Sequence, residues 1–164
     1  MAEITLKTKY FEELDFSIGE DFGEHIVADF GAGERSFWVY VDEEAVTKES
    51  LSIVKRFLDN ADELYKKAIG YIKAHYKEEE GIVSFIHTLL DDVYEDLIEF
   101  YEIEEIDEKG IIDRVELTSL WFSKNDKGNI VCVLDFRMKD DFCDEVIAVR
   151  FDENFEVISV SHES

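Results

Sequence analysis

Carboxylates are the commonest side chains in this chain that could do chemistry, and they are concentrated in one segment. Residues 91–108 contain ten acidic residues and no Lys or Arg. They are Asp91, Asp92, Glu95, Asp96, Glu99, Glu102, Glu104, Glu105, Asp107 and Glu108. Carboxylates can pair with cationic side chains, hold a metal ion or transfer protons. Which of these roles the segment favours depends on the residues around it.

Patterns typical of catalysis or metal binding are missing. No histidine has a second His or Cys four residues away, and no zinc spacing or Asp-x-Asp-x-Asp-Gly calcium loop occurs. Gly31-Ala32-Gly33 lacks the third glycine of a dinucleotide loop and opens no helix. Ser84 and His87 could share a helix face, but such pairs are common by chance. The sequence therefore predicts no catalytic residue, no cofactor and no metal, and a protein that is not an enzyme.

The acidic segment favours electrostatic binding instead. On one continuous helix, the acids of residues 91–102 recur every three to four residues and share one face. Like charges at that spacing destabilise a helix by a few tenths of a kcal/mol per pair, roughly. Residues 51–77, by contrast, carry six Lys or Arg against three acids. The acidic face is therefore either a solvated surface that maintains solubility or a docking surface for a basic protein.

We predict the docking surface and extend it to a second acidic cluster. The predicted partner-binding residues are Asp91, Asp92, Glu95, Asp96, Glu99, Glu102, Glu104, Glu105, Asp140 and Asp141. Asp144-Glu145, and Glu12-Glu13 with Asp15, are further acidic clusters that could join them. Whether these clusters meet in space depends on the fold.

The whole chain is acidic, with 41 Asp and Glu against 17 Lys and Arg and a formal net charge of -24. Such a charge repels nucleic acid and anionic membranes and attracts basic partners. Hydrophobic residues make up 46%, which is enough for a packed core and argues against a disordered acidic tail. Adaptation to high salt is an alternative origin of the charge. The length of 164 residues predicts a single domain, residues 1–164.

The sequence also predicts a cytoplasmic location. The first residues have no basic segment followed by an apolar one, as a secretory signal would, and no apolar run is long enough to span a membrane. Cys132 and Cys143 are too few for a disulfide framework, and both lie in strand-like sequence. We expect both to be reduced thiols.

Hydrophobic periodicity predicts strands at both ends of the chain and helices between them. Alternation predicts strands within residues 3–43 and 111–160, and three- to four-residue spacing predicts helices at about 48–79 and 82–102. The fold class is therefore α+β, with antiparallel sheet or sheets from the N- and C-terminal strands packed on a central helical hairpin. Trp38 and Trp121 lie in aromatic strands, which predicts burial in the core. The alternative is that they are exposed interface anchors.

The end of the chain resembles a known family. The residues concerned are Val149-Arg150-Phe151-Asp152, the hairpin to Val157-Ile158, and Ser161-His162-Glu163-Ser164. With the order strands–helices–strands, they resemble a family of small acidic bacterial proteins of unknown function. That family is associated with immunity proteins of polymorphic-toxin and contact-dependent-inhibition systems. The resemblance covers about the last third of the chain and implies a non-enzymatic cytoplasmic protein that neutralises a toxin. The resemblance assigns no functional residue to this chain.

Charge and resemblance together favour an immunity-type protein that binds a basic toxin domain through its acidic surface. A nuclease toxin, for example, is basic because it binds phosphate. Three alternatives remain open. They are an acidic mimic of nucleic acid, a small metal-dependent hydrolase, and a soluble α+β domain with an unrelated binding function.

Overall fold

Strands form where apolar and polar residues alternate, because successive side chains of a strand point to opposite faces. The sequence IVCVLDFRM is the clearest case, since its side chains alternate between buried and partly exposed over nine residues. The computed structural model describes residues 2–164 and contains eight strands in that range. They are β1 (Glu3–Leu6), β2 (Leu14–Ser17), β3 (Phe22–Asp29), β4 (Glu34–Val41), β5 (Val115–Lys124), β6 (Ile130–Met138), β7 (Val146–Phe151) and β8 (Val157–Glu163).

The strands make two sheets. β1 and β2 pair with each other, and the remaining strands form a six-stranded sheet in the order β3-β4-β5-β6-β7-β8. All pairs are antiparallel except β4 and β5, which are parallel. A parallel pair needs a long crossover, and the entire helical region supplies it here. The six-stranded sheet therefore joins the N-terminal and C-terminal strands, and it is mixed rather than purely antiparallel.

The helical region contains five α-helices among the described residues, and the predicted two-helix hairpin is not confirmed. They are α1 (Lys48–Asp59), α2 (Ala61–His75), α3 (Glu80–Asp92), α4 (Tyr94–Phe100) and α5 (Glu108–Ile112). Short 3-10 turns, η1 (Glu43–Ala45) and η2 (Lys139–Asp141), follow β4 and β6. The predicted helix 48–79 is therefore divided into α1 and α2, and the predicted helix 82–102 into α3 and α4. α5 also occupies the first two residues of the range 111–160, in which strands were predicted.

The two breaks occur at residues with no strong helix-breaking side chain. At Asn60 the backbone leaves helical geometry (φ -114°, ψ 23°), and the side-chain amide donates a hydrogen bond to the Arg56 carbonyl at 2.7 Å. Such a local bond competes with the helix's own pattern. At Val93 the backbone is similarly non-helical (φ -134°, ψ 25°). The acidic segment is therefore not one continuous helix.

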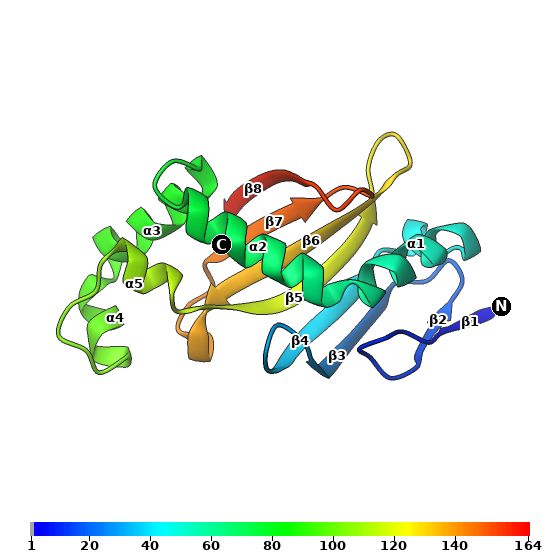
Figure 1. Cartoon of the computed structure of the whole chain (residues 1–164), viewed down its shortest axis with the longest axis horizontal. Helices are drawn as coiled ribbons and strands as arrows, with labels where there is room; N and C mark the ends of the chain where they lie inside the picture. The colour runs from blue at the N-terminus through cyan, green and yellow to red at the C-terminus, as the bar shows by residue number, and fades with distance from the viewer. Residues whose placement is uncertain (1) are drawn as a thin grey trace.

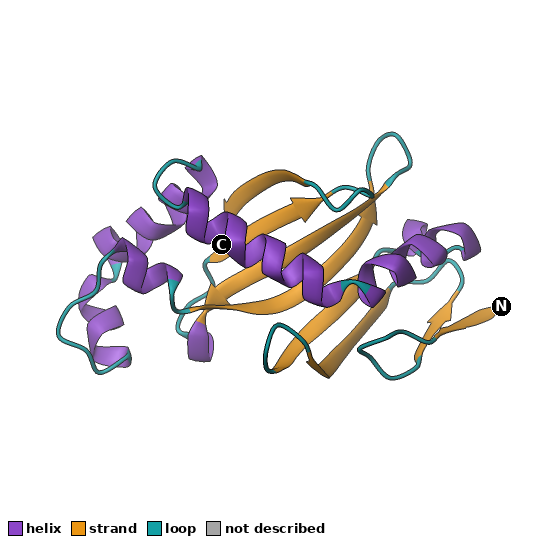
Figure 2. Cartoon of the chain, in the orientation of Figure 1, coloured by secondary structure: helices purple, strands orange, loops and turns teal. Residues whose placement is uncertain are grey.

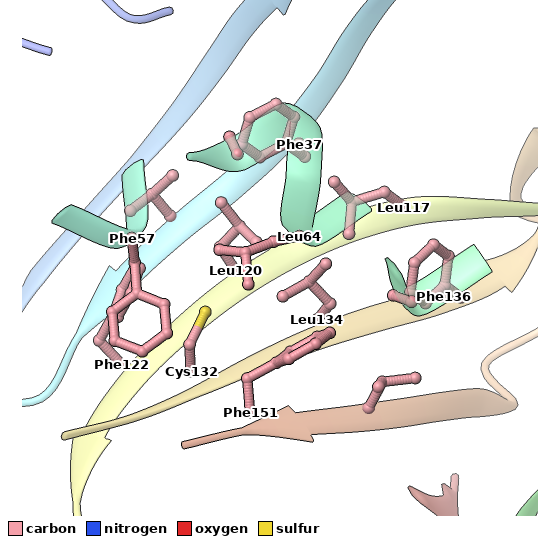
Figure 3. Close-up of a cluster of buried hydrophobic side chains, with 14 of the residues drawn as sticks. Phe37, Phe57, Leu64, Leu117, Leu120, Phe122, Cys132, Leu134, Phe136 and Phe151 are labelled. Atoms are coloured by element: carbon pink, nitrogen blue, oxygen red, sulfur yellow. The ribbon is translucent and has the colours of Figure 1, made fainter. Parts of the chain in front are cut away.

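Helices α1, α2 and α3 pack on the same face of the six-stranded sheet (Figure 1, Figure 2). Phe57 of α1 contacts Phe122 of β5, with ring centroids 5.7 Å apart, and Tyr65 of α2 contacts Phe136 of β6 at 6.2 Å. α3 packs on the β8 edge, where its Phe85 meets His162 edge-on at 5.8 Å. Figure 3 shows the resulting core, in which side chains of β4, β5, β6 and β7 meet those of α1 and α2. We call the opposite side of this sheet the open face.

Both cysteines are free thiols, as predicted. Cys132 lies on β6 in the core, and its burial raises the pKa of the thiol well above the ordinary value. Cys143 lies in the loop before β7, so its assignment to a strand was wrong. No helix within residues 2–164 is both long enough and apolar enough to cross a membrane.

Candidate functional site

The acidic segment 91–108 lies at the end of the molecule farthest from the N-terminus (Figure 1). It covers the end of α3, all of α4, and the loop to α5. All ten carboxylates are exposed, while Leu97 and Ile106 anchor the segment to the core. Among residues 2–164, none of the ten forms an ion pair. In contrast, three acids of α1 and α2 (Asp59, Asp62 and Glu63) each pair with a lysine four residues away.

The predicted single acidic helix face is corrected by the structure. Asp91 and Asp92 end α3, whereas Glu95 and Asp96 begin α4. Acids are favourable at a helix N-terminus and unfavourable at a C-terminus, so the two pairs have opposite effects on their helices. Glu102 lies outside the helix with φ 55°. Its N–H donates to the Glu99 carbonyl, and the next N–H donates to the Ile98 carbonyl. This is a Schellman ending with Glu where Gly is preferred.

The structure brings Asp140 and Asp141 to the same end of the molecule. They lie in η2, which contacts the end of α4. The Tyr101 hydroxyl donates a 2.8 Å hydrogen bond to the Lys139 carbonyl, and the Phe100 ring meets that of Phe142 at 5.1 Å. Burial, with the Asp140 carboxylate as the next cause, raises the pKa of Tyr101 to about 12. We call residues 91–108 together with Asp140 and Asp141 the acidic end.

The other acidic clusters do not join the acidic end as free carboxylates. Asp144 pairs with Arg137 at 3.6 Å, and Glu145 lies 3.3 Å from His162. Glu12 and Glu13 lie between β1 and β2, at the opposite end of the molecule (Figure 1). Three cations border the acidic end. Lys109 pairs with Asp113 at 3.2 Å, and Lys139 lies in η2 beside Asp140. The guanidinium of Arg114 lies over the Tyr101 ring and donates to the Gly110 carbonyl.

The open face carries a continuous row of aromatic side chains. Trp38 and Trp121 are 44% and 40% exposed, so the prediction that they lie in the core was wrong. Tyr40 lies between them, nearly parallel to Trp38 (8°, centroids 5.7 Å apart) and 4.6 Å from Trp121. His25 of β3 meets the Trp38 ring edge-on at 5.4 Å. We call His25, Trp38, Tyr40 and Trp121 the aromatic row.

Strand register and polar partners fix this row. His25 is opposite Trp38, and Tyr40 is opposite both Gly23 and Trp121. A Cβ at Gly23 would lie 3.2 Å from the Tyr40 ring, so glycine leaves room for that ring. The Trp121 indole N–H donates to the Asp42 carboxylate at 2.7 Å, and His25 Nε2 lies 2.7 Å from the Ser36 hydroxyl.

A groove of about 470 Å³ lies beside the aromatic row and extends to the acidic end. Its lining includes His25 and Trp38 from the row, the carboxylates of Glu34 and Glu116, and Asp141 of η2. Arg35 also borders it, but its guanidinium lies 3.8 Å from the Tyr65 ring centroid and donates to the Phe30 and Gly31 carbonyls. The groove therefore connects the two candidate surfaces and contains three carboxylates.

A half-buried acid lies in the middle of the open face. Asp135 of β6 accepts a 2.8 Å hydrogen bond from the Ser119 hydroxyl. Burial raises the pKa of Asp135, and Glu163 adds to that effect, while the Ser119 hydrogen bond, Arg150 and Arg137 oppose it. The folded protein therefore holds a proton on Asp135 more tightly than the unfolded chain does.

We expect Asp135→Asn to stabilise the protein at pH 7 by up to about 1 kcal/mol. Asn keeps an acceptor for Ser119 and removes the desolvated charge. Because the folded pKa lies above the unfolded value of 3.8, the ionised carboxylate costs stability as pH rises through these two values. Urea unfolding at pH 7 and at pH 3 measures the difference. The stabilisation by Asn should be present at pH 7 and absent at pH 3, where Asp135 is protonated in both the folded and the unfolded protein. An equal effect at both pH values would contradict this origin.

A hydrogen-bonded chain of Ser84, His162 and Glu145 is the arrangement most like a catalytic one. The Ser84 hydroxyl lies 2.8 Å from His162 Nδ1, and His162 Nε2 lies 3.3 Å from the Glu145 carboxylate. A nucleophilic serine also needs free donors for an oxyanion. Ser84 is the fifth residue of α3, so the N–H groups around it are used within the helix. The chain of contacts ties α3 to the β8 edge. Among the described residues no group of His, Cys, Asp and Glu could hold a metal ion.

No protein-family model matches the chain, and no curated protein or solved structure matches it either. The resemblance to immunity proteins therefore stays a hypothesis, and the functional argument depends on the surfaces themselves. Sequence reasoning found the acidic segment 91–108, but it gave exposure of Trp38 and Trp121 only as the alternative to burial and did not foresee the row with His25 and Tyr40. A signal was available in the sequence. Trp38 and Tyr40 alternate in step with the polar residues Ser36 and Asp42, which predicts that they lie on the same, solvent-facing side of the strand.

Proposed function

We propose that this protein is a non-enzymatic, immunity-type inhibitor that binds a basic toxin domain through the acidic end. One observation carries the proposal. The ten carboxylates of residues 91–108 are exposed and form no ion pair among residues 2–164, whereas three of the four acids of α1 and α2, all but Glu49, pair with a lysine four residues away. If this surface served only solubility, its carboxylates could have been paired with lysines in the same way.

The physical consequence is a concentrated negative potential at one end of the molecule. Asp140 and Asp141 add to it, because η2 packs against the end of α4. Such a field raises the rate of encounter with a basic protein, by up to several orders of magnitude at low salt. It also repels phosphate backbones, which favours a protein partner. Rapid capture suits an inhibitor whose target is lethal when free.

The proposal is tested with the protein encoded beside this gene, by calorimetry at 50 and 300 mM salt. We expect a complex whose dissociation constant rises about tenfold or more with salt, because screening weakens charge attraction. A complex that is equally tight at both salt concentrations, or no complex, would contradict the electrostatic proposal. Tight binding to several unrelated DNA-binding proteins would instead favour a nucleic-acid mimic.

A further inference from the structure

The open face has an exposed apolar surface that its own chain does not cover. Trp38 and Trp121 are 44% and 40% exposed, and Val27 of the adjacent strand is 57% exposed. Indole rings are seldom so exposed on a surface that has no partner, and Trp is enriched where binding energy is concentrated. The three side chains come from neighbouring strands β3, β4 and β5, so they form one patch rather than scattered residues.

The aromatic row is ordered before any partner arrives. Trp38 stacks on Tyr40, Tyr40 packs on Trp121, and the Trp121 indole is hydrogen-bonded to Asp42. The three rings project from paired strands rather than from loops. A surface already held in one conformation loses little side-chain entropy on binding.

Charge selects the partner. On the strands that carry the row, the open-face side contains Asp29, Glu34 and Glu116, with Asp42 just beyond β4. Two cations border this region. Arg35 is turned to the helix-covered side and packs on Tyr65. Arg137 of β6 lies cross-strand from Glu116 and pairs with Asp144 at 3.6 Å. A second copy of this chain, with a charge of -24, would be repelled from such a surface. A neutral apolar partner would leave carboxylates desolvated and unpaired.

We infer that the aromatic row and the adjoining groove dock an arginine-bearing segment of a basic protein partner. A guanidinium stacks flat on indole and tyrosine rings and still donates hydrogen bonds in its plane. The groove offers acceptors within the same site, the carboxylates of Glu34, Glu116 and Asp141. Lysine fits less well because its ammonium is a compact, strongly hydrated charge. The inference rests on the proposed function for the partner's basic character, but it names a different surface.

The probe is an amidated hexa-arginine peptide, with hexa-lysine and hexa-glutamate peptides as comparisons. The two tryptophans give two indole N–H signals in a ¹H–¹⁵N spectrum of the labelled protein. We expect both signals to shift saturably with hexa-arginine, to need several-fold more hexa-lysine, and to stay unchanged with hexa-glutamate. Indole signals that do not move with hexa-arginine would overturn the inference.

Variants separate the open face from the acidic end. Trp38→Thr with Trp121→Thr should weaken hexa-arginine binding about tenfold, whereas Trp38→Tyr with Trp121→Tyr should retain most of it. The matched control is Glu95→Gln with Glu99→Gln, which removes charge from α4 and leaves the rings in place. Circular dichroism establishes that each variant is folded. Wild-type affinity in the folded Thr variant would overturn the inference.

The same variants distinguish this inference from the proposed function. If the protein encoded beside the gene binds wild type and the Thr variant equally well, the docking inference is overturned and the proposed function stands. If hexa-arginine shifts the indole signals but that protein does not bind, the proposed function fails and the docking surface stands.

Discussion

Reversing four charges at the acidic end should weaken binding to the basic partner by about a hundredfold or more at low salt. The variant is Glu95→Lys, Asp96→Lys, Glu99→Lys and Glu102→Lys. All four side chains are exposed and form no ion pair within residues 2–164, so the change acts on the partner rather than on internal contacts. Calorimetry with the protein encoded beside the gene measures the affinity. Its association rate should fall more than its dissociation rate rises, because long-range attraction acts before contact.

Stability must be followed in the same variant. Lysine at the first turn of α4 opposes the helix dipole and costs roughly 0.3–1 kcal/mol per site, whereas lysine at Glu99 near the last turn is favourable. The net effect on unfolding should therefore be small. Replacing Glu95 and Asp96 by Gln instead of Lys avoids most of the dipole cost.

The matched control reverses four exposed acids at the other end of the molecule, namely Glu3, Glu12, Glu13 and Glu20. It changes the net charge by the same amount and leaves the acidic end intact. We expect at most a severalfold loss of affinity, because charges beyond a Debye length of about 8–10 Å are screened. An equal loss in both variants would mean that overall charge, and not the acidic end, attracts the partner.

Removing the Phe57 ring should have the largest effect on stability. Its side chain is fully buried and joins α1 both to Phe122 of β5 and to Phe155 in the turn between β7 and β8. Phe57→Ala should lower the free energy of unfolding by about 3–5 kcal/mol, through lost burial and the cavity that remains. That is a large part of the roughly 5–15 kcal/mol that stabilises a typical domain.

Urea unfolding followed by circular dichroism measures this loss, with Ile158→Ala as the control. Ile158 is also a large apolar residue, but it is 54% exposed on β8. Its replacement should change stability by roughly 0.5 kcal/mol or less. If Phe57→Ala and Ile158→Ala lowered the free energy of unfolding by similar amounts, the contacts of Phe57 between α1 and the sheet would not be a main source of stability.

Local pattern was a good guide to element type. β6 and β7 both lie within the range 111–160 in which strands were predicted. Alternation is regular in β6, whereas β7 is almost continuously apolar. The helical ranges were also correct in outline. The breaks at Asn60 and Val93 were missed, because neither position has the Pro or Gly that usually marks a break. The single-domain prediction for residues 1–164 and the cytoplasmic location stay predictions.

Part of the candidate site could also be predicted. The concentration of acid in residues 91–108 is a property of the chain order, and a helix or a loop would leave it exposed in either case. That Asp140 and Asp141 join it depends on the contact of Phe142 with Phe100 and Tyr101, across about forty residues of sequence. Contacts between such distant segments leave no local pattern.

The sequence by itself determined the element types, the acidity and its concentration at 91–108. Only the tertiary structure decided which side of each strand is covered. In the segment SFWVYV both faces are apolar, since Phe37, Val39 and Val41 alternate with Trp38 and Tyr40. The polar Ser36 and Asp42, which lie on the same side as Trp38 and Tyr40, are the one local sign of which set faces solvent, and two flanking residues do not decide it. The parallel pairing of β4 with β5, and the packing of α1 and α2 on one side, bury the first set and leave the aromatic row exposed.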